Sequence, residues 1–255
     1  MQVWDSVGSW LAQRRQISGG KTIGFVPTMG ALHRGHASLV ERSVAENDLT
    51  VVSVFVNPTQ FNDPKYLDRY PRTFEDDLAL LRSLGVDHVL SPSKAELYPQ
   101  GYRFRLESEA MTSVMEGVHR PGFLQGVMTV VLKLLNIVRA DRAYFGEKDY
   151  QQLQTIKEMV DDFFVPTEIV ACETIREDSG LAESSRNRLL SEPGRLQAAA
   201  IYKALTRCPD VESATRTLAA QGFEIDYIEE HWGRRFAAVF LEGIRLIDNV
   251  PAPRR

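Results

Sequence analysis

The sequence predicts an α/β fold: a Rossmann-like domain with a parallel sheet, followed by a smaller α+β domain. Short apolar runs rich in β-branched residues alternate along the chain with segments of helical period, a pattern typical of strands joined by helices. One run, Val51–Val56, is almost continuously apolar. Because a parallel sheet is covered on both faces, such a run favours a parallel sheet.

The elements of the first domain follow from these patterns in chain order. Five apolar runs predict strands, the first of which should stop at Pro27. The predicted strands are Thr22–Val26, Thr50–Val56, His88–Leu90, Ala143–Phe145 and Thr167–Ala171. Apolar residues three or four positions apart predict helices over 37–45, 78–84, 124–138 and 153–160.

The character of the chain changes near residues 172–190, where a polar stretch with one glycine interrupts the alternation. An alanine-rich run then predicts a helix over Arg195–Leu205, and a second helix is expected over Val211–Gln221. Two or three strand-like pieces follow, at Ile225–Ile228, Phe236–Leu241 and Ile244–Ile247. We therefore expect two domains, 1–173 and 174–255.

Composition narrows the class of protein. A net charge of -4 over 255 residues gives no electrostatic footprint for nucleic acid or an anionic membrane. The most apolar stretch, Gly126–Val138, is too short to span a bilayer, and the N-terminus lacks the pattern of a signal peptide. Two cysteines without metal-ligand spacing suit a reducing compartment. These features predict a cytoplasmic protein that binds neither nucleic acid nor membrane.

The segment Gly24–His36, with sequence GFVPTMGALHRGH, carries the strongest functional signal. It has the order strand, glycine-bearing loop, helix start, which is where an open α/β sheet binds phosphate. His33 and His36 flank Gly35, so both imidazoles could reach a bound triphosphate, whereas metal ligation lacks a third ligand nearby. The segment therefore predicts a nucleotide site.

Three further segments carry polar or charged groups at comparable places. Asn57 and Gln60 follow the second predicted strand and suit a substrate with hydroxyl and carboxylate groups. Lys148 follows a later strand through Gly146 and could meet phosphate. Ser184–Arg186, at the domain junction, offers two hydroxyls and a guanidinium that suit phosphate oxygens. Each segment alone also has an ordinary interpretation as a polar turn or a solvated charge cluster.

An acidic run, Glu75–Asp77, is expected in the first turn of a helix, where carboxylates usually complement the helix dipole. A Mg²⁺ role is the alternative, since Mg²⁺ bound to a triphosphate needs only one or two protein carboxylates.

Taken together, these segments resemble the pantothenate synthetase (pantoate–β-alanine ligase) family of the HxGH nucleotidylyltransferase superfamily. The match runs in order along nearly the whole chain, whereas HxGH alone would indicate only the superfamily. The matching stretches are PTMGALHRGH, SVFVNPTQF, YPRT, MEGVHRPG with GVMTVVLKLLNIV, FGEKDYQQL, REDSGLAESSRNRLL and RLIDN.

The resemblance implies an AMP-forming ligase, a Rossmann-like domain with a small C-terminal lid domain, and a homodimer. The family's substrates are pantoate, β-alanine and ATP, and the family uses Mg²⁺. Pantoate's carboxylate attacks the α-phosphorus to give a pantoyl adenylate and pyrophosphate; the amine of β-alanine then displaces AMP.

The resemblance also assigns roles to residues. His36 would be the proton donor beside His33, and these two would act with Lys148, Ser184, Ser185 and Arg186 on the phosphates. Asp149 would contact the ribose of ATP, and Ile175 would contact adenine through its backbone. The remaining ATP contacts that the resemblance implies are Met29, Gly30, Ala31, Leu32, Arg34, Gly35, Gly146, Glu147 and Glu183. Gln60 and Gln152 would contact pantoate, with Asn57 beside them, and Asp76 would lie near Mg²⁺.

Four positions depart from the family pattern. Phe123 stands where a histidine is usual, Glu173 where a proline is usual, and Ser179 where an aspartate is usual. Glu183 replaces a methionine or leucine, and we expect its side chain to point away from the phosphates while its backbone makes the contact.

Two alternatives remain at this point. A related adenylyltransferase acting on a phosphorylated substrate would need lysine or arginine in place of Gln60 and Gln152. A nucleotide-binding protein without catalysis is suggested by the departures at Phe123, Ser179 and Glu183, but intact His33, His36, Lys148 and Arg186 argue against it.

Overall fold

The computed structural model describes residues 1–17, 20–61 and 64–253. The chain divides into two compact units. Unit 1 comprises Met1–Gly146 and Gln151–Cys172, and unit 2 comprises Glu147–Tyr150 and Glu173–Arg255. The main division therefore falls between Cys172 and Glu173, and the four-residue segment after Gly146 belongs to the second unit.

Unit 1 is built on a parallel six-stranded sheet with the order β1-β4-β3-β2-β5-β6, formed within the described residues. Its strands are β1 (Gln2–Trp4), β2 (Ile23–Thr28), β3 (Leu49–Val54), β4 (His88–Leu90), β5 (Arg142–Gly146) and β6 (Glu168–Cys172). Its longer helices are α1 (Val7–Gln16), α2 (Arg34–Glu46), α4 (Phe74–Ser83), α8 (Phe123–Val138) and α9 (Tyr150–Asp162). Short helices complete it: η1 (Pro58–Gln60), α3 (Pro64–Arg69), α5 (Lys94–Leu97), α6 (Glu109–Thr112) and α7 (Glu116–His119).

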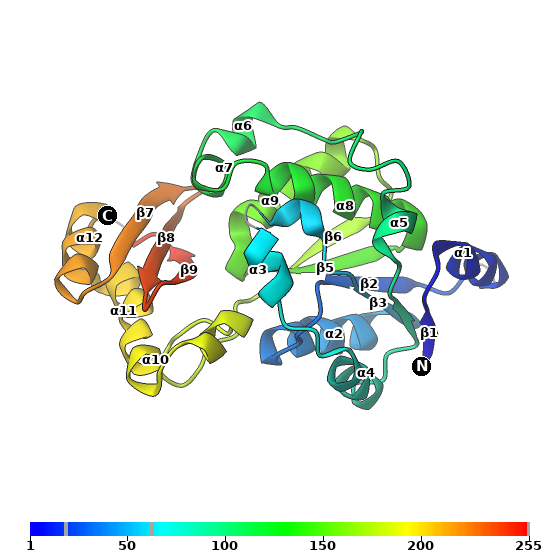
Figure 1. Cartoon of the computed structure of the whole chain (residues 1–255), viewed down its shortest axis with the longest axis horizontal. Coiled ribbons are helices and arrows are strands. Elements are labelled where there is room, and N and C mark those ends of the chain that lie inside the picture. Colours follow the sequence, from blue (N-terminus) through cyan, green and yellow to red (C-terminus); the bar gives the residue numbers. More distant parts are fainter. Residues whose placement is uncertain (18–19, 62–63, 254–255) are drawn as a thin grey trace. The chain divides into compact units, whose positions relative to one another are not determined.

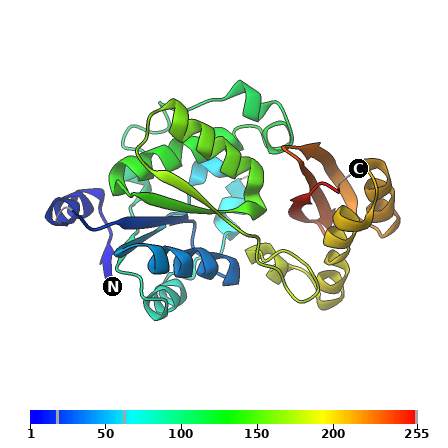
Figure 2. The ribbon, with the colours of Figure 1, turned by 180° about the vertical axis from the view of Figure 1, so that it is seen from behind.

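The strand order confirms the predicted Rossmann-like sheet. The chain winds from β2 to β3 and β4 in one direction and places β5 and β6 on the other side of β2. Figures 1 and 2 show α2 and α4 on one face of the sheet and α8 and α9 on the other. The winding therefore reverses between β2 and β5, and ligands of such sheets bind at the carboxyl ends of the strands beside that point.

The strand predicted at Thr22–Val26, which is β2 in the structure, extends further than predicted. β2 continues through Pro27 to Thr28, so the expectation that it stops at Pro27 is wrong. β5 pairs with β2 only at Gly24 and Phe25, and proline is tolerated beyond that pairing because no partner there needs its N–H. β1, which pairs with β4, was not predicted at all.

Unit 2 is an antiparallel sheet, β7-β8-β9, covered by helices. Its strands are β7 (Glu224–His231), β8 (Arg234–Leu241) and β9 (Ile244–Pro251), and its helices are η2 (Glu147–Asp149), η3 (Ser185–Leu189), α10 (Glu192–Ala198), α11 (Ala200–Arg207) and α12 (Val211–Ala220). Figure 1 shows α11 and α12 beside this sheet. The predicted helix over Arg195–Leu205 is in fact two helices, because α10 ends at Ala198 and α11 begins at Ala200, with Ala199 as the cap between them.

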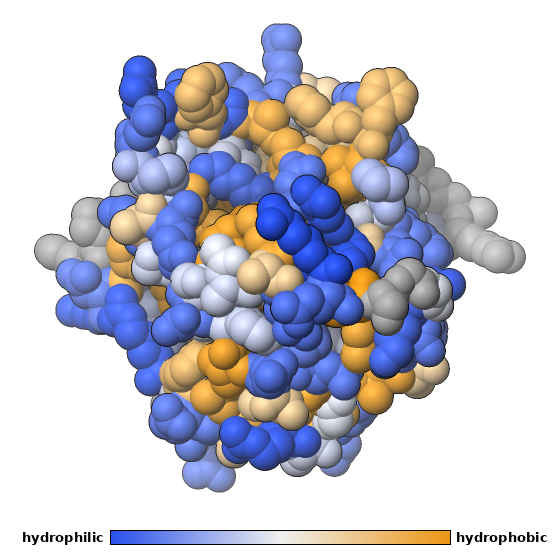
Figure 3. Space-filling model, turned by 90° about the vertical axis from the view of Figure 1, so that its right-hand side faces the viewer, coloured by the Kyte–Doolittle hydropathy of each residue, from blue (hydrophilic) through white to orange (hydrophobic). Residues whose placement is uncertain are grey.

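Each unit has its own apolar core. In unit 1 residues such as Val26, Val40 and Leu81 pack between the sheet and its helices, and in unit 2 Leu205, Leu218 and Val239 do the same. Figure 3 shows polar side chains interspersed with apolar ones on the face that carries α1. Across the described residues, no helix has the combined length and hydrophobicity of a membrane span.

Candidate active site

The loop between β2 and α2 is held in shape by its own polar groups. The Gly30 N–H donates to Thr28 Oγ1 at 3.2 Å, and that hydroxyl donates to the Ser53 carbonyl at 2.8 Å. Gly30 has a φ of +75°, and a Cβ there would lie 2.9 Å from Asp77 Oδ2. Glycine is therefore required at this position for both backbone conformation and space.

Asp77, from α4, binds the same loop. Its carboxylate accepts the N–H of Ala31 at 2.9 Å and the N–H of Leu32 at 2.8 Å. Thr73 Oγ1 donates to it at 3.3 Å, and the residue is 3% exposed. A buried carboxylate thus fixes the backbone immediately before His33.

His33 and His36 lie together at the start of α2. His33 is the N-cap, its Nδ1 accepts from the Gly35 N–H at 3.1 Å, and His36 Nδ1 accepts from the His33 N–H at 3.4 Å. The ring centroids are 4.1 Å apart. Because each Nδ1 is an acceptor, the proton of each neutral ring is on Nε2, so both rings have an Nε2–H donor. A pair of donors at a helix N-terminus can stabilise developing negative charge.

The turn after β3 is built around Asn57. Its Oδ1 accepts from Thr59 Oγ1 at 3.0 Å and from the Tyr98 hydroxyl at 2.9 Å, and its Nδ2 donates to the Gly126 carbonyl at 3.2 Å. Asn57 is 1% exposed, so its amide holds the turn. Gln60 ends this turn, and within the described residues its amide has no assigned hydrogen-bond partner. Of these two predicted substrate contacts, Gln60 is the one with an uncommitted amide.

A chain of hydrogen bonds links the Gln60 turn to the first turn of α9. Arg120 donates to the Gln60 carbonyl at 3.3 Å and to the Glu116 carboxylate at 3.1 Å. The Glu116 N–H in turn donates to Gln151 Oε1 at 2.9 Å. Gln151 is 3% exposed, whereas the neighbouring Gln152 is partly exposed. Gln151 is therefore a structural residue, and Gln152 is the glutamine of this pair that can meet a ligand.

In unit 2, the turn that carries Lys148 is bound to β9 and β8. Asn249 Nδ2 donates to the carbonyls of Glu147 and Lys148 at 2.9 and 3.0 Å. Arg234 lies 3.5 Å from the Glu147 carboxylate, and its guanidinium lies 4.5 Å above the ring of Tyr150. The backbone of this turn is thus fixed, while Lys148 itself is partly exposed.

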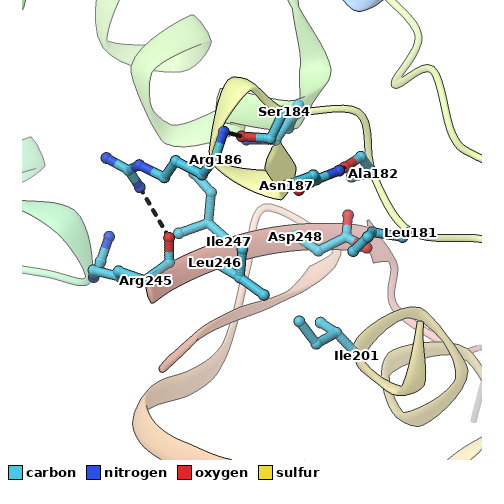
Figure 4. A pocket seen from close by; sticks show the side chains of 11 residues that line it. Leu181, Ala182, Ser184, Arg186, Asn187, Ile201, Arg245, Leu246, Ile247 and Asp248 are labelled. Atoms are coloured by element: carbon cyan, nitrogen blue, oxygen red, sulfur yellow. Dashed lines mark hydrogen bonds between the residues drawn. The ribbon is translucent and has the colours of Figure 1, made fainter. Parts of the chain in front are cut away.

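The loop Ser184–Arg186 lies beside the same strand. Ser184 is the N-cap of η3, and its Oγ accepts from the Arg186 N–H at 3.2 Å, while the Arg186 guanidinium donates to the Arg245 carbonyl at 3.2 Å (Figure 4). A small hollow that opens to solvent is bordered by this loop, Lys148 and β9. Its lining includes Lys148, Ser184, Arg186, Asn187, Arg245 and Asp248. Two of the predicted phosphate-binding cations therefore border one hollow.

The remaining predicted ATP contacts lie on these same segments. Ile175 accepts the Glu183 N–H at 2.9 Å through its carbonyl. The N–H of Glu183 is therefore used within the protein, which leaves only its carbonyl for the expected backbone contact. Gly146 ends β5, and the others are half-buried or exposed in the β2–α2 loop, the first turn of α2, η2 and η3: Met29, Arg34, Gly35, Glu147, Asp149 and Ser185.

The four departures from the family pattern are accommodated locally. Phe123 is 8% exposed, and the Arg120 guanidinium lies 3.5 Å from its ring centroid. Ser179 Oγ accepts the Leu181 N–H at 3.3 Å, which is the acceptor role an aspartate could fill. The negative charge of Glu183 is felt by Arg195. The pKa of Arg195 is raised chiefly by its hydrogen bonds to Glu177 and to a smaller extent by the charge of Glu183. Glu173 is exposed.

Asp76 and Asp77 are adjacent but differently placed. Asp76 is exposed on the first turn of α4, whereas Asp77 is buried against the β2–α2 loop. Among the described residues, no three His, Cys, Asp or Glu side chains are grouped so that they could hold a metal ion. A single exposed carboxylate suits Mg²⁺ that is bound mainly through phosphates.

Sequence reasoning missed Asp77 and Asn249 as parts of the site. An acidic residue in the first turn of a helix is already explained by its interaction with the helix dipole, so the sequence did not single out Asp77. Asn249 belongs to the motif RLIDN, but nothing local indicates that its amide binds a turn about 100 residues earlier.

The fold and these side chains define an α/β nucleotide-binding protein, with imidazole and cationic donors on segments that follow its strands. The family model for pantoate-beta-alanine ligase matches residues 2–251. The chain belongs to the pantoate–β-alanine ligase family.

Curated relatives and solved structures agree with this assignment. The pantothenate synthetase of Bdellovibrio bacteriovorus is 49% identical over 249 residues and is covered to 98%, as is this chain. That of Legionella pneumophila (strain Corby) is 47% identical, with 98% of this chain and 99% of the relative covered. The structure of pantoate-β-alanine ligase from Francisella tularensis, in complex with β,γ-ATP and β-alanine, matches with a TM-score of 0.94 and 41% identity, covering 98% of this chain and 97% of that one. Pantothenate synthetase from Thermus thermophilus matches with a TM-score of 0.90 and 40% identity, covering 99% of this chain and 100% of that one. The chain is thus an ATP-dependent ligase that joins pantoate to β-alanine.

Proposed function

We propose that the chain carries out this condensation through a pantoyl adenylate, with the residue roles that follow. Pantoate's carboxylate attacks the α-phosphorus of ATP, the bond to the bridging oxygen breaks, and pyrophosphate leaves. The amine of β-alanine then attacks the activated acyl carbon, and AMP leaves with the bonding electron pair as pantothenate forms. The attacking carboxylate is already ionised at pH 7, so the first step needs charge stabilisation and alignment rather than a general base.

The donors at the start of α2 would serve the first step. His36 acts as proton donor with His33 beside it, both through Nε2–H. The β2–α2 loop from Met29 and the first residues of α2, Arg34 and Gly35, line the nucleotide. The two Nδ1 hydrogen bonds support this proposal, because they fix the tautomer that leaves Nε2–H as the donor.

In unit 2, Lys148 and Arg186 would bind phosphate oxygens, with Ser184 and Ser185 donating through their hydroxyls. Asp149 would meet the ribose, and Ile175 and Glu183 would meet the nucleotide through backbone groups. The single observation that supports this proposal most is that Lys148, Ser184 and Arg186 line one hollow.

Gln60 and Gln152 would hold pantoate, and Asn57 would act by holding the turn. Neutral amides suit a hydroxy acid, whereas a phosphorylated substrate would need lysine or arginine there. The hydrogen-bond chain from the Gln60 carbonyl through Arg120 and Glu116 ends at Gln151, the residue before Gln152, and so supports a common substrate site for Gln60 and Gln152.

Mg²⁺ would be held by Asp76 together with phosphate oxygens, in line with the preference of this ion for few protein carboxylates. When bound, it would neutralise charge on the phosphates.

By the same family resemblance we assign the chain to the cytoplasm, which its two free cysteines suit. We also assign it to a homodimer, which light scattering coupled to size-exclusion chromatography would test.

One assay tests the proposed function. Purified protein is incubated with ATP, Mg²⁺ and pantoate, with and without β-alanine, and AMP, pyrophosphate and pantothenate are measured. We expect pantoate-dependent pyrophosphate release and β-alanine-dependent AMP release. His36→Ala and Lys148→Ala should each lower turnover roughly 10²-fold or more, as with other removed transition-state donors. Wild-type turnover in either variant would refute the role of that residue.

A further inference from the structure

Asn249 uses its whole amide to hold another segment. Both hydrogens of Nδ2 go to the carbonyls of Glu147 and Lys148, and Oδ1 accepts from Arg234 Nε at 2.6 Å. The residue is 1% exposed. A carboxamide is the small side chain that can give two hydrogens from one atom while its oxygen accepts from a cation. An aspartate of the same shape would instead place negative charge against two carbonyl oxygens.

Asp248, the preceding residue on β9, holds the other segment. Its carboxylate accepts from both Nη atoms of Arg176, at 2.6 and 2.9 Å, and from the Asn249 N–H at 2.8 Å. Arg176 also donates to the Gly180 carbonyl at 3.0 Å and lies 4.2 Å above the ring of Tyr202. Such a two-point ion pair fixes orientation as well as distance.

Arg176 begins the turn that leads to the Ser184–Arg186 loop. It forms an isolated β-bridge with Ala182, and Glu177 accepts from Asn187 Nδ2 at 3.0 Å. The loop is thereby tied to β9 through Arg176 and Asp248. Adjacent residues of one strand therefore hold the Lys148 turn and the Ser184–Arg186 loop.

From this geometry we propose that Asp248 and Asn249 are positioning residues, which set the separation between Lys148 and the Ser184–Arg186 loop so that both meet the triphosphate. The proposal rests on the phosphate-binding role proposed above for those residues. Neither Asp248 nor Asn249 needs to touch substrate. Their contribution is preorganisation, because donors that are already placed need no rearrangement as charge develops.

A purely structural role makes a different prediction from a positioning role. Val250, next to Asn249, is 4% exposed and packs into the apolar core of unit 2, and it touches neither predicted cation segment through an assigned hydrogen bond. Val250→Ala is therefore a matched control that destabilises the same strand without releasing the Lys148 turn.

The experiment compares Asn249→Ala, Asn249→Ser and Val250→Ala by thermal unfolding, by ATP binding in titration calorimetry without pantoate, and by steady-state kinetics. If Asn249→Ala does not fold, Asn249→Ser is used, since it keeps one donor. We expect the Asn249 variant to lower kcat/KM for ATP about 10- to 100-fold, with KM for β-alanine unchanged. Val250→Ala should lower the unfolding temperature but keep kcat/KM for ATP within about twofold when assayed below it.

A double variant isolates the route of the effect. If Asn249 acts through Lys148, then adding Asn249→Ala to Lys148→Ala should cost less than about threefold in kcat/KM for ATP. An undiminished additional loss, or equal losses in the Asn249 and Val250 variants, would overturn the proposal.

The calorimetric arm separates this proposal from the proposed function. If the wild-type protein releases no AMP with pantoate and β-alanine, the proposed function fails. Weaker ATP binding by the Asn249 variant than by Val250→Ala would still support positioning, and equal binding would refute it.

Discussion

Replacing Asp77 by alanine should disorder the β2–α2 loop and abolish most activity. The carboxylate accepts the N–H groups of Ala31 and Leu32, both of which are buried. Alanine leaves these two donors without an acceptor and removes the bond from Thr73. The backbone just before His33 then loses the hydrogen bonds that fix it.

The magnitude follows from the two backbone hydrogen bonds that the substitution removes. Hydrogen bonds to a charged group contribute roughly 1.5–3 kcal/mol each, so two of them amount to roughly 3–6 kcal/mol. For a domain of this size, 1 kcal/mol shifts the unfolding temperature by about 2–4 °C, which predicts a decrease of roughly 6–24 °C. Asp77→Asn keeps one acceptor oxygen and should lose roughly half as much free energy of unfolding.

The assay pairs thermal unfolding with pyrophosphate release, and Asp76→Ala is the matched control. Asp76 is adjacent but exposed, so its substitution should leave the unfolding temperature unchanged while raising the Mg²⁺ concentration needed for activity. The reasoning is refuted if Asp77→Ala unfolds at the wild-type temperature, or if Asp76→Ala is destabilised as strongly.

Three further outcomes are expected. Gln60→Ala should raise KM for pantoate about tenfold, the equivalent of one lost hydrogen bond of roughly 1.4 kcal/mol, and an unchanged KM would argue against the contact. Gly126→Ala would place a Cβ 2.5 Å from the carbonyl oxygen of Thr59, so it should cost about 1–3 kcal/mol by overpacking and also raise KM for pantoate; unaltered unfolding and kinetics would contradict this. Burial lowers the pKa of His88, whose Nδ1 accepts from Trp4 Nε1 at 3.3 Å. As the pH falls, His88 therefore takes up its proton in the unfolded state before it does so in the folded state. The contribution of neutral His88 to the free energy of unfolding should be fully present above about pH 6.5 and should decrease as the pH drops below that value. Unfolding temperatures measured from about pH 8 to 5 should show a smaller decrease in His88→Gln than in wild type, and parallel curves would rule this out.

The sheet was predictable wherever burial alone sets the pattern. β4 lies at His88–Leu90 as predicted, because a short apolar strand in the sheet interior has no competing explanation. The helix break at Ala199 was not predictable from propensity, since alanine has the highest helix propensity. β1, also three residues long, was missed because it is an edge strand whose residues are exposed or only partly buried, so no apolar run marks it.

In the candidate site, too, some contacts could be predicted from the sequence and others could not. The arrangement of His33 and His36 was expected from their spacing, because a helix start brings positions i and i+3 together. Asp77 and Asn249 are different, since each acts on backbone groups that are distant in the sequence. Backbone groups leave no signature in the side-chain pattern of either partner, so only the folded chain identifies such contacts.

This division also explains why polar residues of the same type have different roles here. Asp77, Asn249 and Gln151 are almost fully buried, and each uses its oxygens or amide hydrogens on the protein's own backbone. Asp76 and Gln152, each adjacent to one of them, are more exposed. In these two pairs the buried residue has its hydrogen bonds satisfied within the protein, which leaves the more exposed neighbour able to meet a ligand. In each adjacent pair, burial therefore agrees with a positioning role for one residue and with the binding role proposed for the other.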